Sequence, residues 1–360
     1  MRILFVSDAP SAHTQRWAGY FRERGDEVHV ASFRHSNIYG VGVHLLPTYG
    51  LGKAGYPLAV FALRNLYHTI KPDIVHAQYV TSYGFIAALA NIKPLVVTAW
   101  GTDVLLAPQK SILIRFLVSY ALRKADVITT VAEHMNKSVR RLTTGDKDIQ
   151  AIPFGVDTAF FRIKAHQRQE NRPIQLICTR NFAPIYDVAT LIKAVSMLKE
   201  RGLNIKTMLA GNGPLKDALE DIVKRLGLQD EITFLGYQSP KALVEHLNES
   251  DIFITPALSD GNNISLNEAM ACGCFPIATE IPANTQWIKD GYNGYLYPPG
   301  DAKVLAEAIE KALSNQELRQ KSLLINRKII EEGANWKFCV EKMEEIYRSL
   351  IRGRRGLEEK

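Results

Sequence analysis

The feature that most constrains the fold is an alternation of short, β-branched apolar runs with longer amphipathic stretches. The order strand, helix, strand favours a parallel sheet that is covered by helices. The strands predicted for the first half are residues 2–7, 27–32, 73–76, 95–98 and 127–130. The clearest helices predicted between them lie near residues 15–24 and 58–70.

The second half of the chain repeats this order. Its predicted strands are residues 175–178, 206–210, 232–235, 252–255 and 275–278. Its predicted helices are residues 190–200, 215–226, 241–247, 264–272, 302–314, 317–332 and 336–351. A polar stretch at residues 162–172, which holds three Arg and precedes Pro173, is the best candidate for a linker between the halves.

We therefore predict an α/β fold with two doubly wound, Rossmann-like domains that face each other across a cleft. The domains are residues 1–165 and 166–337, and residues 338–360 form a C-terminal helix that packs back on the first domain. With 46% hydrophobic residues among 360, the chain has enough apolar material for two cores. Ligands of such sheets bind at the carboxyl ends of the strands, so a shared site would lie in the cleft.

The net charge of +7 is concentrated in one half of the chain. Residues 1–170 hold 20 Lys and Arg against 12 Asp and Glu, whereas residues 171–360 hold 24 against 25. The first half is thus +8 and the second −1. This asymmetry suggests an anionic partner for the first half, such as nucleic acid, a membrane surface or a phosphorylated substrate. The alternative is a charge that serves solubility alone.

Targeting and redox features are few. The apolar run at the N-terminus stops at Asp8, too early for a signal peptide, and no run reaches the ~18–20 apolar residues of a spanning helix. The segment Ser111–Leu122, interrupted by Arg115, predicts either an amphipathic segment on anionic lipid or an ordinary surface helix. Four Cys without a C-x-x-C pair argue against a disulfide scaffold and a structural zinc, and they fit a reduced compartment.

The most informative motif is residues 256–273, which follow a predicted strand. A turn at Asp260–Gly261 leads into a predicted helix that carries Glu268. Free N–H groups and the dipole at a helix N-terminus attract phosphate, so this turn predicts a phosphate cradle. Two flanking carboxylates suit the hydroxyls of a nucleotide sugar, although Asp260 could equally be a helix cap and nothing more.

An acid, seven residues, a second acid and then Ala269–Gly273 resemble the signature of glycosyltransferase family 4 (glycosyl transferases group 1). Further matches in the family's order are residues 72–77, 152–157, 209–214, 233–236, 276–279 and 289–301. The resemblance covers nearly the whole chain. It implies the GT-B fold and transfer of a sugar with retention of its anomeric configuration.

Roles for the second half follow from the resemblance. Glu268 would bind the ribose, and Asp260, where the family usually has Glu, would hold sugar hydroxyls. Arg180 would bind the diphosphate and, with Asp260, carry the catalysis. Gly211 would border the nucleotide, although a turn glycine is equally expected there. The diphosphate cradle would be formed by the backbone of Gly261, Asn262, Asn263, Ile264 and Ser265.

Three departures from the family pattern concern the same sites. The Lys that usually follows the Arg is replaced here by Ile185 and Tyr186, and Tyr186 would donate one hydrogen bond to the donor but no charge. Trp100 replaces a His that commonly faces the donor sugar, in a segment that ends at Asp103. The N-terminal Gly-Gly loop is absent, and His13 stands there instead. We expect His13, Trp100 and Asp103 at the acceptor side or in the cleft, with a structural role for His13 as the alternative.

The resemblance implies a retaining glycosyltransferase that uses a nucleotide diphosphate sugar, with UDP favoured and GDP left open. The acceptor would be a glycan or a lipid-linked molecule in polysaccharide, lipopolysaccharide or glycolipid synthesis. Arg180 and the helix N-terminus would replace a metal, no cofactor is implied, and nucleic acid is not expected as a partner. A cytoplasmic enzyme, peripheral on an anionic membrane through its first domain, fits best. The alternatives are a catalytically weak, nucleotide-sugar-binding subunit and a sugar epimerase of the same fold.

Overall fold

The computed structural model describes residues 1–164 and 172–358, and the side chains as far as residue 354. The chain divides into two compact units, Met1–Phe154 with Phe338–Lys360, and Gly155–Lys337. The chain thus leaves the first unit, builds the second and returns to the first. Most of the expected linker, and the expected domain limit at residues 165 and 166, lie outside the described residues, so those limits stay a prediction.

The described part of the first unit contains a seven-stranded, fully parallel sheet. Its strands are β1 Arg2–Val6, β2 Glu27–Ser32, β3 Gly42–Leu45, β4 Ile74–Gln78, β5 Leu95–Ala99, β6 Val127–Thr130 and β7 Ile149–Ala151. Their order is β3-β2-β1-β4-β5-β6-β7. The order reverses between β1 and β4, which makes the carboxyl ends of these two strands the switch point of a doubly wound sheet.

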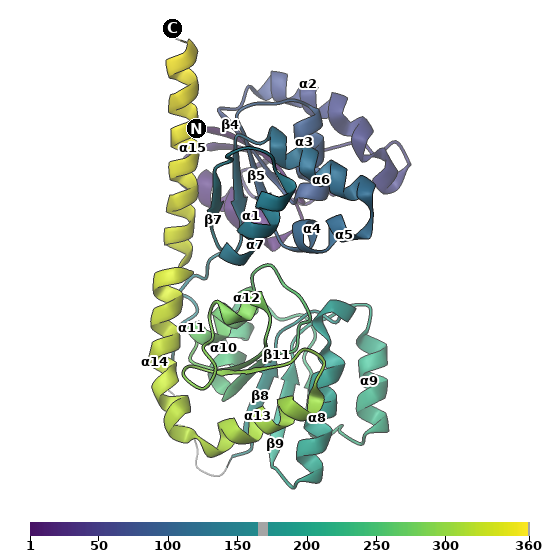
Figure 1. Ribbon diagram of the computed structural model, residues 1–360, viewed down its shortest axis with the longest axis vertical. Helices are drawn as coiled ribbons and strands as arrows, with labels where there is room; N and C mark the ends of the chain where they lie inside the picture. Colours follow the sequence, from purple (N-terminus) through teal and green to yellow (C-terminus); the bar gives the residue numbers. More distant parts are fainter. Residues whose placement is uncertain (165–171, 359–360) are drawn as a thin grey trace. The chain divides into compact units, whose positions relative to one another are not determined.

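Helices connect these strands and complete the first unit (Figure 1). They are α1 Ala12–Glu23, η1 Gly52–Ala59, α2 Val60–Ile70, η2 Val80–Gly84, α3 Phe85–Leu89, α4 Thr102–Leu105, α5 Ala107–Lys110, α6 Ile112–Lys124, α7 Glu133–Leu142 and α15 Trp336–Glu358. From Phe338 onward α15 belongs to this unit, and its residues Cys339, Val340 and Tyr347 are fully buried.

The second unit holds a six-stranded parallel sheet among its described residues. Its strands are β8 Ile174–Cys178, β9 Ile205–Leu209, β10 Ile232–Phe234, β11 Ile252–Thr255, β12 Phe275–Thr279 and β13 Tyr295–Tyr297. The order is β10-β9-β8-β11-β12-β13, so the switch point lies between β8 and β11. The helices are η3 Pro184–Tyr186, α8 Val188–Glu200, α9 Lys216–Arg225, α10 Pro240–Glu249, α11 Ile264–Ala271, α12 Pro282–Thr285, α13 Ala302–Ser314 and α14 Gln316–Gly333.

Two apolar layers bury the faces of the second sheet. Side chains of Ile252 and Ile254 pack with α8, α9 and α13, whereas Phe253 between them packs with α10, α11 and α14. This is the period of two that places neighbouring strand residues on opposite faces. Figure 1 shows the two groups of helices around this sheet. The sheet is therefore held rigidly, and its strand ends make fixed supports for a site.

The predicted fold class, two doubly wound α/β domains of Rossmann-like type, is confirmed. Every strand predicted from the sequence is present, with ends that agree to within two residues. The strands that the sequence did not signal are β3, β7 and β13, which have three or four residues and lie at sheet edges. β3 and β7 lack the continuous apolar run of a central strand, and β13 is only three residues long, which explains the omission.

No helix in the described residues is long and apolar enough to cross a membrane.

Candidate active site

The switch point of the second sheet brings together two segments that lie far apart in sequence. Thr179 and Arg180 follow β8, and the loop 256–263 follows the neighbouring strand β11 and leads into α11. Parallel neighbours end at the same edge of a sheet, so these two segments converge. Sequence reasoning had selected residues of both segments, and the structure joins them.

Arg180 is the centre of this convergence. Its side chain is buried, one Nη donates to Asp260 Oδ2 at 2.5 Å, and the other donates to Asn263 Oδ1 at 2.8 Å. Its guanidinium also lies over the ring of Tyr186, 4.1 Å from the ring centre. Burial of a guanidinium is costly unless it is paired, and this one is fixed on three sides. The cation therefore stands in one orientation at the sheet edge.

Asn263 holds both the cation and the helix. Its Oδ1 accepts from the Leu266 N–H and caps α11, while its Nδ2 donates to Thr255 Oγ1 and to Asn284 Oδ1. Every polar atom of this buried side chain therefore takes part in a hydrogen bond. The predicted part of Asn263 in a phosphate cradle is thus limited to its backbone, and its side chain is a positioning group for Arg180. No sequence pattern signalled the partnership with Asn284.

Several buried polar atoms at Thr179, at Arg180 and at the start of α11 have no hydrogen-bond partner within the described residues. They are Thr179 Oγ1, Arg180 Nε, Asn262 Nδ2 and Asn267 Oδ1. Buried polar groups are nearly always satisfied, so a cluster of unsatisfied ones calls for an explanation such as a bound ligand. The three donors among them suit the oxygens of an anionic ligand. Thr179 and Asn267 were not selected from the sequence, because nothing local distinguishes them.

The first turns of α11 offer a second part of the site. Ser265 and Glu268 are three residues apart on one half-buried face of the helix, and Ser265 Oγ donates to the Thr179 carbonyl. Part of the expected cradle is already occupied, because the Ile264 N–H donates to the Asn262 carbonyl. Gly261 and Asn262 are buried in the turn before the helix. The structure therefore brings Arg180, Asp260 and the α11 N-terminus together and places Glu268 on the adjoining face.

Gly211 supports the site from behind. A Cβ at this position would lie 2.3 Å from the Arg180 carbonyl oxygen, so the backbone after β9 approaches the Arg180 loop more closely than any side chain allows. The expected contact of Gly211 with a nucleotide stays a prediction. What the geometry itself requires is a glycine for packing.

The residues expected on the acceptor side form an aromatic cluster in the first unit. The His13 ring stacks on Phe154, with centroids 3.8 Å apart and planes at 10°, and both rings meet the edge of Trp100. Tyr79, which follows β4, meets Trp100 in a further edge contact. These residues follow different strands at the carboxyl edge of the first sheet. His13 and Trp100 are therefore neighbours, whereas Phe154 and Tyr79 were not selected from the sequence.

The expected place of Asp103 at the acceptor side or in the cleft stays a prediction, and the structure gives its side chain a structural role. It is fully buried and its carboxylate accepts from the N–H groups of Val80, Trp100 and Gly101. Burial raises the pKa of this carboxyl. Asp103 therefore positions the loops after β4 and β5. The loop after β4 is also unusual, because Tyr79 has φ 76° and precedes the π-helical turn η2, both features that concentrate at functional sites.

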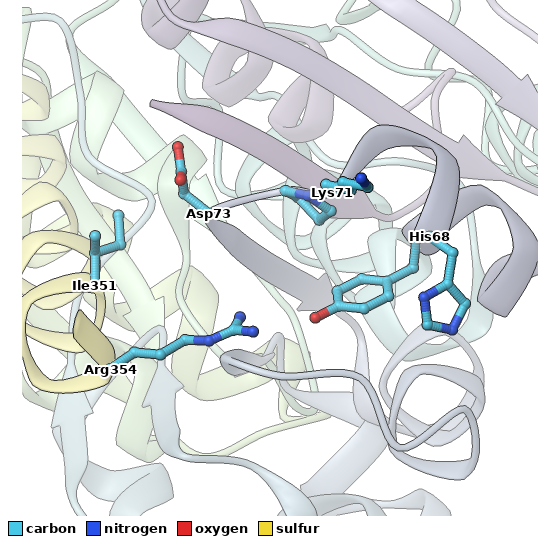
Figure 2. A pocket seen from close by; sticks show the side chains of 7 residues that line it. His68, Lys71, Asp73, Ile351 and Arg354 are labelled. Carbon is cyan, nitrogen blue, oxygen red and sulfur yellow. The ribbon is translucent and has the colours of Figure 1, made fainter. Parts of the chain in front are cut away.

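A cavity of about 520 Å³ lies elsewhere in the first unit (Figure 2). Figure 2 shows His68, Lys71 and Asp73 across from Ile351 and Arg354 of α15. Asp73 precedes β4, so this cavity lies at the amino end of the strand, opposite the edge where ligands of such sheets bind. Asp73 accepts from the Arg2 N–H, and Arg354 donates to the Lys93 carbonyl. We therefore do not assign the cavity to the candidate site.

Metal ligation has no support in the described residues, where no three His, Cys, Asp or Glu side chains gather to hold an ion. Positive charge at the candidate site comes from Arg180 and from the N-terminus of α11.

Two family models match this chain, one in each half of the sequence. Residues 160–324 match the family model of glycosyl transferases group 1, and residues 2–132 match the model glycosyl transferase 4-like. A relative from Bacillus anthracis, N-acetyl-alpha-D-glucosaminyl L-malate synthase, is 28% identical over 92% of this chain and 91% of its own length.

Solved structures show the same fold over almost the whole chain. Sucrose-phosphate synthase from Thermosynechococcus elongatus superposes with a TM-score of 0.85 at 18% identity, covering 98% of this chain and 99% of that one. The Anabaena protein HepE, solved in complex with UDP-glucose, superposes with a TM-score of 0.81 at 17% identity, covering 97% and 100%. At such identities the likeness is one of fold.

Two doubly wound parallel α/β units, with a cationic site at a switch point, define a protein of the GT-B fold. The chain belongs to the glycosyl transferase group 1 family. It is accordingly a glycosyltransferase that uses a nucleotide sugar.

Proposed function

We propose that the protein transfers a sugar from a UDP-sugar to a glycan or lipid-linked acceptor, with retention of configuration, at an anionic membrane surface. The observation that carries the donor half is the fixed Arg180 with unsatisfied buried donors around it. The solved complex of HepE with UDP-glucose supports UDP as the nucleotide. The excess of positive charge in the first half supports an anionic acceptor or surface there.

The residues divide the work as follows. Arg180, whose Nε–H has no partner in the part of the chain that the structure describes, and the N-terminus of α11 stabilise the negative charge that grows on the leaving diphosphate. Asp260 uses Oδ2 for Arg180, which leaves its other oxygen for a sugar hydroxyl. Glu268 accepts from the ribose. The departing phosphate takes the acceptor proton on the same face of the sugar, which retains the anomeric configuration.

Donor choice is tested by thermal shift with UDP, GDP, ADP and TDP. A ligand at a hundred times its Kd stabilises the folded state by about 2.7 kcal/mol, which is a readable shift. We expect UDP to give the largest shift, and a larger shift with GDP would overturn the UDP assignment.

Transfer from a radiolabelled UDP-sugar should continue in EDTA, since Arg180 and α11 supply the positive charge.

The site assignment is tested by Glu268→Gln and Arg180→Gln. Both variants should weaken UDP binding, by about tenfold for loss of a charge-assisted hydrogen bond of ~1.5 kcal/mol. The control is Glu307→Gln, which removes an exposed carboxylate on α13. Unchanged UDP affinity in both site variants would show that the nucleotide binds elsewhere.

A second acceptor class has one specific observation in its favour. The Bacillus anthracis relative is named for transfer to L-malate, a small dicarboxylic acid. A small carboxylate would also suit a basic first unit. Incubation with UDP-sugars and malate, followed by mass spectrometry, distinguishes the two acceptor classes. A sugar-malate adduct would assign malate as the acceptor instead of a glycan or lipid-linked molecule.

The absence of the family's Lys leaves a catalytically weak subunit as the alternative to transfer. Slow hydrolysis of the donor without acceptor, or transfer with one, would exclude that alternative. UDP binding without either reaction would favour it.

A further inference from the structure

The short helix α12, Pro282–Thr285, contributes a buried amide to the surroundings of the candidate site. Asn284 in this helix is fully buried, and its Nδ2 donates to the Thr279 carbonyl at 2.9 Å and to Thr279 Oγ1 at 3.1 Å. Its Oδ1 accepts from Asn263 Nδ2 at 2.9 Å. Asn263 Oδ1 in turn accepts from Arg180 at 2.8 Å. Hydrogen bonds thus run without a break from the end of β12 to the cation.

A backbone carbonyl fixes the orientation of both amides in this row. A carbonyl oxygen can only accept, so the Thr279 carbonyl requires the NH2 group of Asn284 and leaves the Asn284 oxygen for Asn263. That oxygen can also only accept, so Asn263 must offer it an NH2 group and present its own oxygen to Arg180. The Leu266 N–H, which can only donate, requires the same orientation of Asn263. A reversed Asn263 amide would place one donor against another at the guanidinium.

The hydroxyl of Thr255 cannot fix this orientation. Asn263 Nδ2 also donates to Thr255 Oγ1 at 3.0 Å, but a hydroxyl can donate or accept and so tolerates either orientation of the amide. With an apolar residue in place of Asn284, Asn263 Nδ2 would keep Thr255 Oγ1 as an acceptor and lose the other. Loss of a hydrogen-bond partner in a buried site is costly, and the Asn263 side chain would no longer be held on this side.

The same helix also supports the ring that lies over Arg180. Tyr186 packs against Ile281 and Ala283, which are the N-cap and a residue of α12. The Asn263 amide and the Tyr186 ring are two of the contacts that hold the Arg180 guanidinium. Both of these contacts therefore depend on one turn of helix that does not itself touch the guanidinium through any hydrogen bond of the described residues.

We propose that Asn284 is a positioning residue for the cation that binds the diphosphate. By fixing the Asn263 amide, it holds Arg180 in the orientation in which the guanidinium meets the leaving diphosphate, and it does so without touching the substrate. A cation that is oriented before the reaction stabilises the developing charge without a cost of reorganisation. The inference rests on the proposed function for the role of Arg180, but not for the base or the acceptor.

Calorimetric titration of the full chain with pyrophosphate and with UDP tests the proposal. Pyrophosphate reports the diphosphate contact without any base. Asn284→Leu should weaken the binding of both ligands about fivefold, as expected for the loss of one buried hydrogen bond. Hydrolysis of a UDP-sugar without acceptor gives a second readout. Its kcat should fall by a larger factor than KM rises, because a misplaced cation fails most at the transition state.

A double variant separates positioning from a general loss of structure. If Asn284 acts through Asn263, the double variant Asn263→Leu, Asn284→Leu should bind pyrophosphate no more weakly than Asn263→Leu alone. The matched control is Asn326→Leu. Asn326 is a fully buried asparagine of the same unit and is hydrogen-bonded to another asparagine, Asn293. Its loss should lower the melting temperature to a similar degree and leave both affinities within about twofold of the parent.

Asn284→Asp tests the same row of hydrogen bonds through pH. A protonated carboxyl can donate to the Thr279 carbonyl and accept from Asn263, as the amide does, whereas the ionised form can only accept. Burial beside a carbonyl oxygen keeps such a carboxyl protonated to higher pH. Relative to the parent, this variant should bind pyrophosphate almost normally at about pH 5.5 and about fivefold more weakly at about pH 8.

The outcomes distinguish this proposal from the proposed donor. Unchanged affinities in Asn284→Leu, additive losses in the double variant or an equal loss in Asn326→Leu would overturn the role of Asn284. If Asn284→Leu does not fold, the pH comparison decides, and a ratio of Asn284→Asp to parent that is the same at both pH values would overturn it. A parent that binds pyrophosphate but prefers GDP to UDP would instead overturn the donor and leave the role of Asn284 standing.

Discussion

Arg180 illustrates how much of this enzyme depends on single side chains. Asp260 and Asn263 fix its two terminal nitrogens, and the Tyr186 ring covers its face. The resemblance to the family implies a Lys near the position of Tyr186. In this chain the Tyr186 ring stands there instead and packs on the Arg180 guanidinium. The ring is itself packed against Ala257, Ile281 and Ala283.

Replacement of Tyr186 tests this role. Cation–π contacts contribute roughly 0.5–2 kcal/mol depending on solvation. Tyr186→Leu should therefore weaken UDP binding about fivefold by titration calorimetry, because Arg180 loses one of its three supports. Tyr186→Phe keeps the ring and should bind almost as the parent does. Equal losses in both variants would instead assign the effect to the hydroxyl.

Gly211 provides a prediction of stability at the same scale. Gly211→Ala places a methyl group 2.3 Å from the Arg180 carbonyl oxygen, and the backbone cannot move away cheaply. We expect the free energy of unfolding to fall by about 1–3 kcal/mol in urea titrations. The control is Gly19→Ala in α1, where nothing lies within 4 Å of the new methyl group and alanine favours the helix. A neutral Gly211→Ala would contradict the close approach.

At the scale of elements, the last helix is fastened to the first sheet through one buried histidine. Nδ1 of His76 in β4 is hydrogen-bonded to the Tyr347 hydroxyl of α15, and Nε2 is hydrogen-bonded to Thr98 Oγ1 of β5, each at 2.5 Å. Thr98 Oγ1 is in turn hydrogen-bonded to Thr129 Oγ1 of β6. Complete burial lowers the pKa of His76 to about 3 and raises that of Tyr347 well above its ordinary value. The network is therefore neutral at physiological pH.

This burial predicts how stability depends on pH. The unfolded chain protonates His76 below its ordinary pKa of 6.5, but the folded chain does so only near pH 3, so the unfolded state gains stability as the pH falls between these values. His76 then contributes a loss of about 2 kcal/mol between pH 6.5 and 5. In urea titrations, His76→Gln should reduce that pH-dependent loss, and the exposed His68→Gln should not. An unchanged slope in His76→Gln would contradict the assignment.

At the scale of the whole molecule, the charge follows the structural units. Residues 1–154 and 338–360 hold 23 Lys and Arg against 15 Asp and Glu, a net of +8, and residues 155–337 hold 21 against 22. The two units have the same net charges as the two halves of the sequence, although the last 23 residues belong to the first unit and not to the second. The positive charge therefore belongs to one folded unit.

The return of the chain to the first unit can be tested by truncation. Removal of residues 338–360 takes away Tyr347 and leaves His76 without that partner, so the first unit should lose about 3–5 kcal/mol or more of stability. The second unit should keep its thermal shift with UDP, because its candidate site uses no residue of α15. Truncation after Arg352 keeps Tyr347 and serves as the control. Loss of UDP binding in the longer truncation would contradict this division.

The local pattern was sufficient for the central strands, the main helices and the order of the motifs. Apolar periodicity is a property of neighbouring residues, so β8, β11 and α11 could be predicted from it. Asp260 and Glu268 were found from the motif around the turn, and Arg180 was implied by the resemblance to the family. The short edge strands β3 and β7 were missed because they are half exposed, and β13 was missed because three residues are too few to show a pattern. The sequence pattern indicated a membrane-surface segment as one alternative for Ser111–Leu122. It did not indicate which apolar residues of this segment face outward.

The sequence by itself determined the family, the two doubly wound units and the candidate acids and cation. Only the tertiary structure decided that Arg180 meets Asp260 and Asn263, some 80 residues away, and that Asp103 turns inward to bind backbone N–H groups. It also decided that Tyr347 reaches His76 across 271 positions. The physical reason is that periodicity specifies which residues are buried, whereas the order of strands in a sheet specifies which buried residues meet.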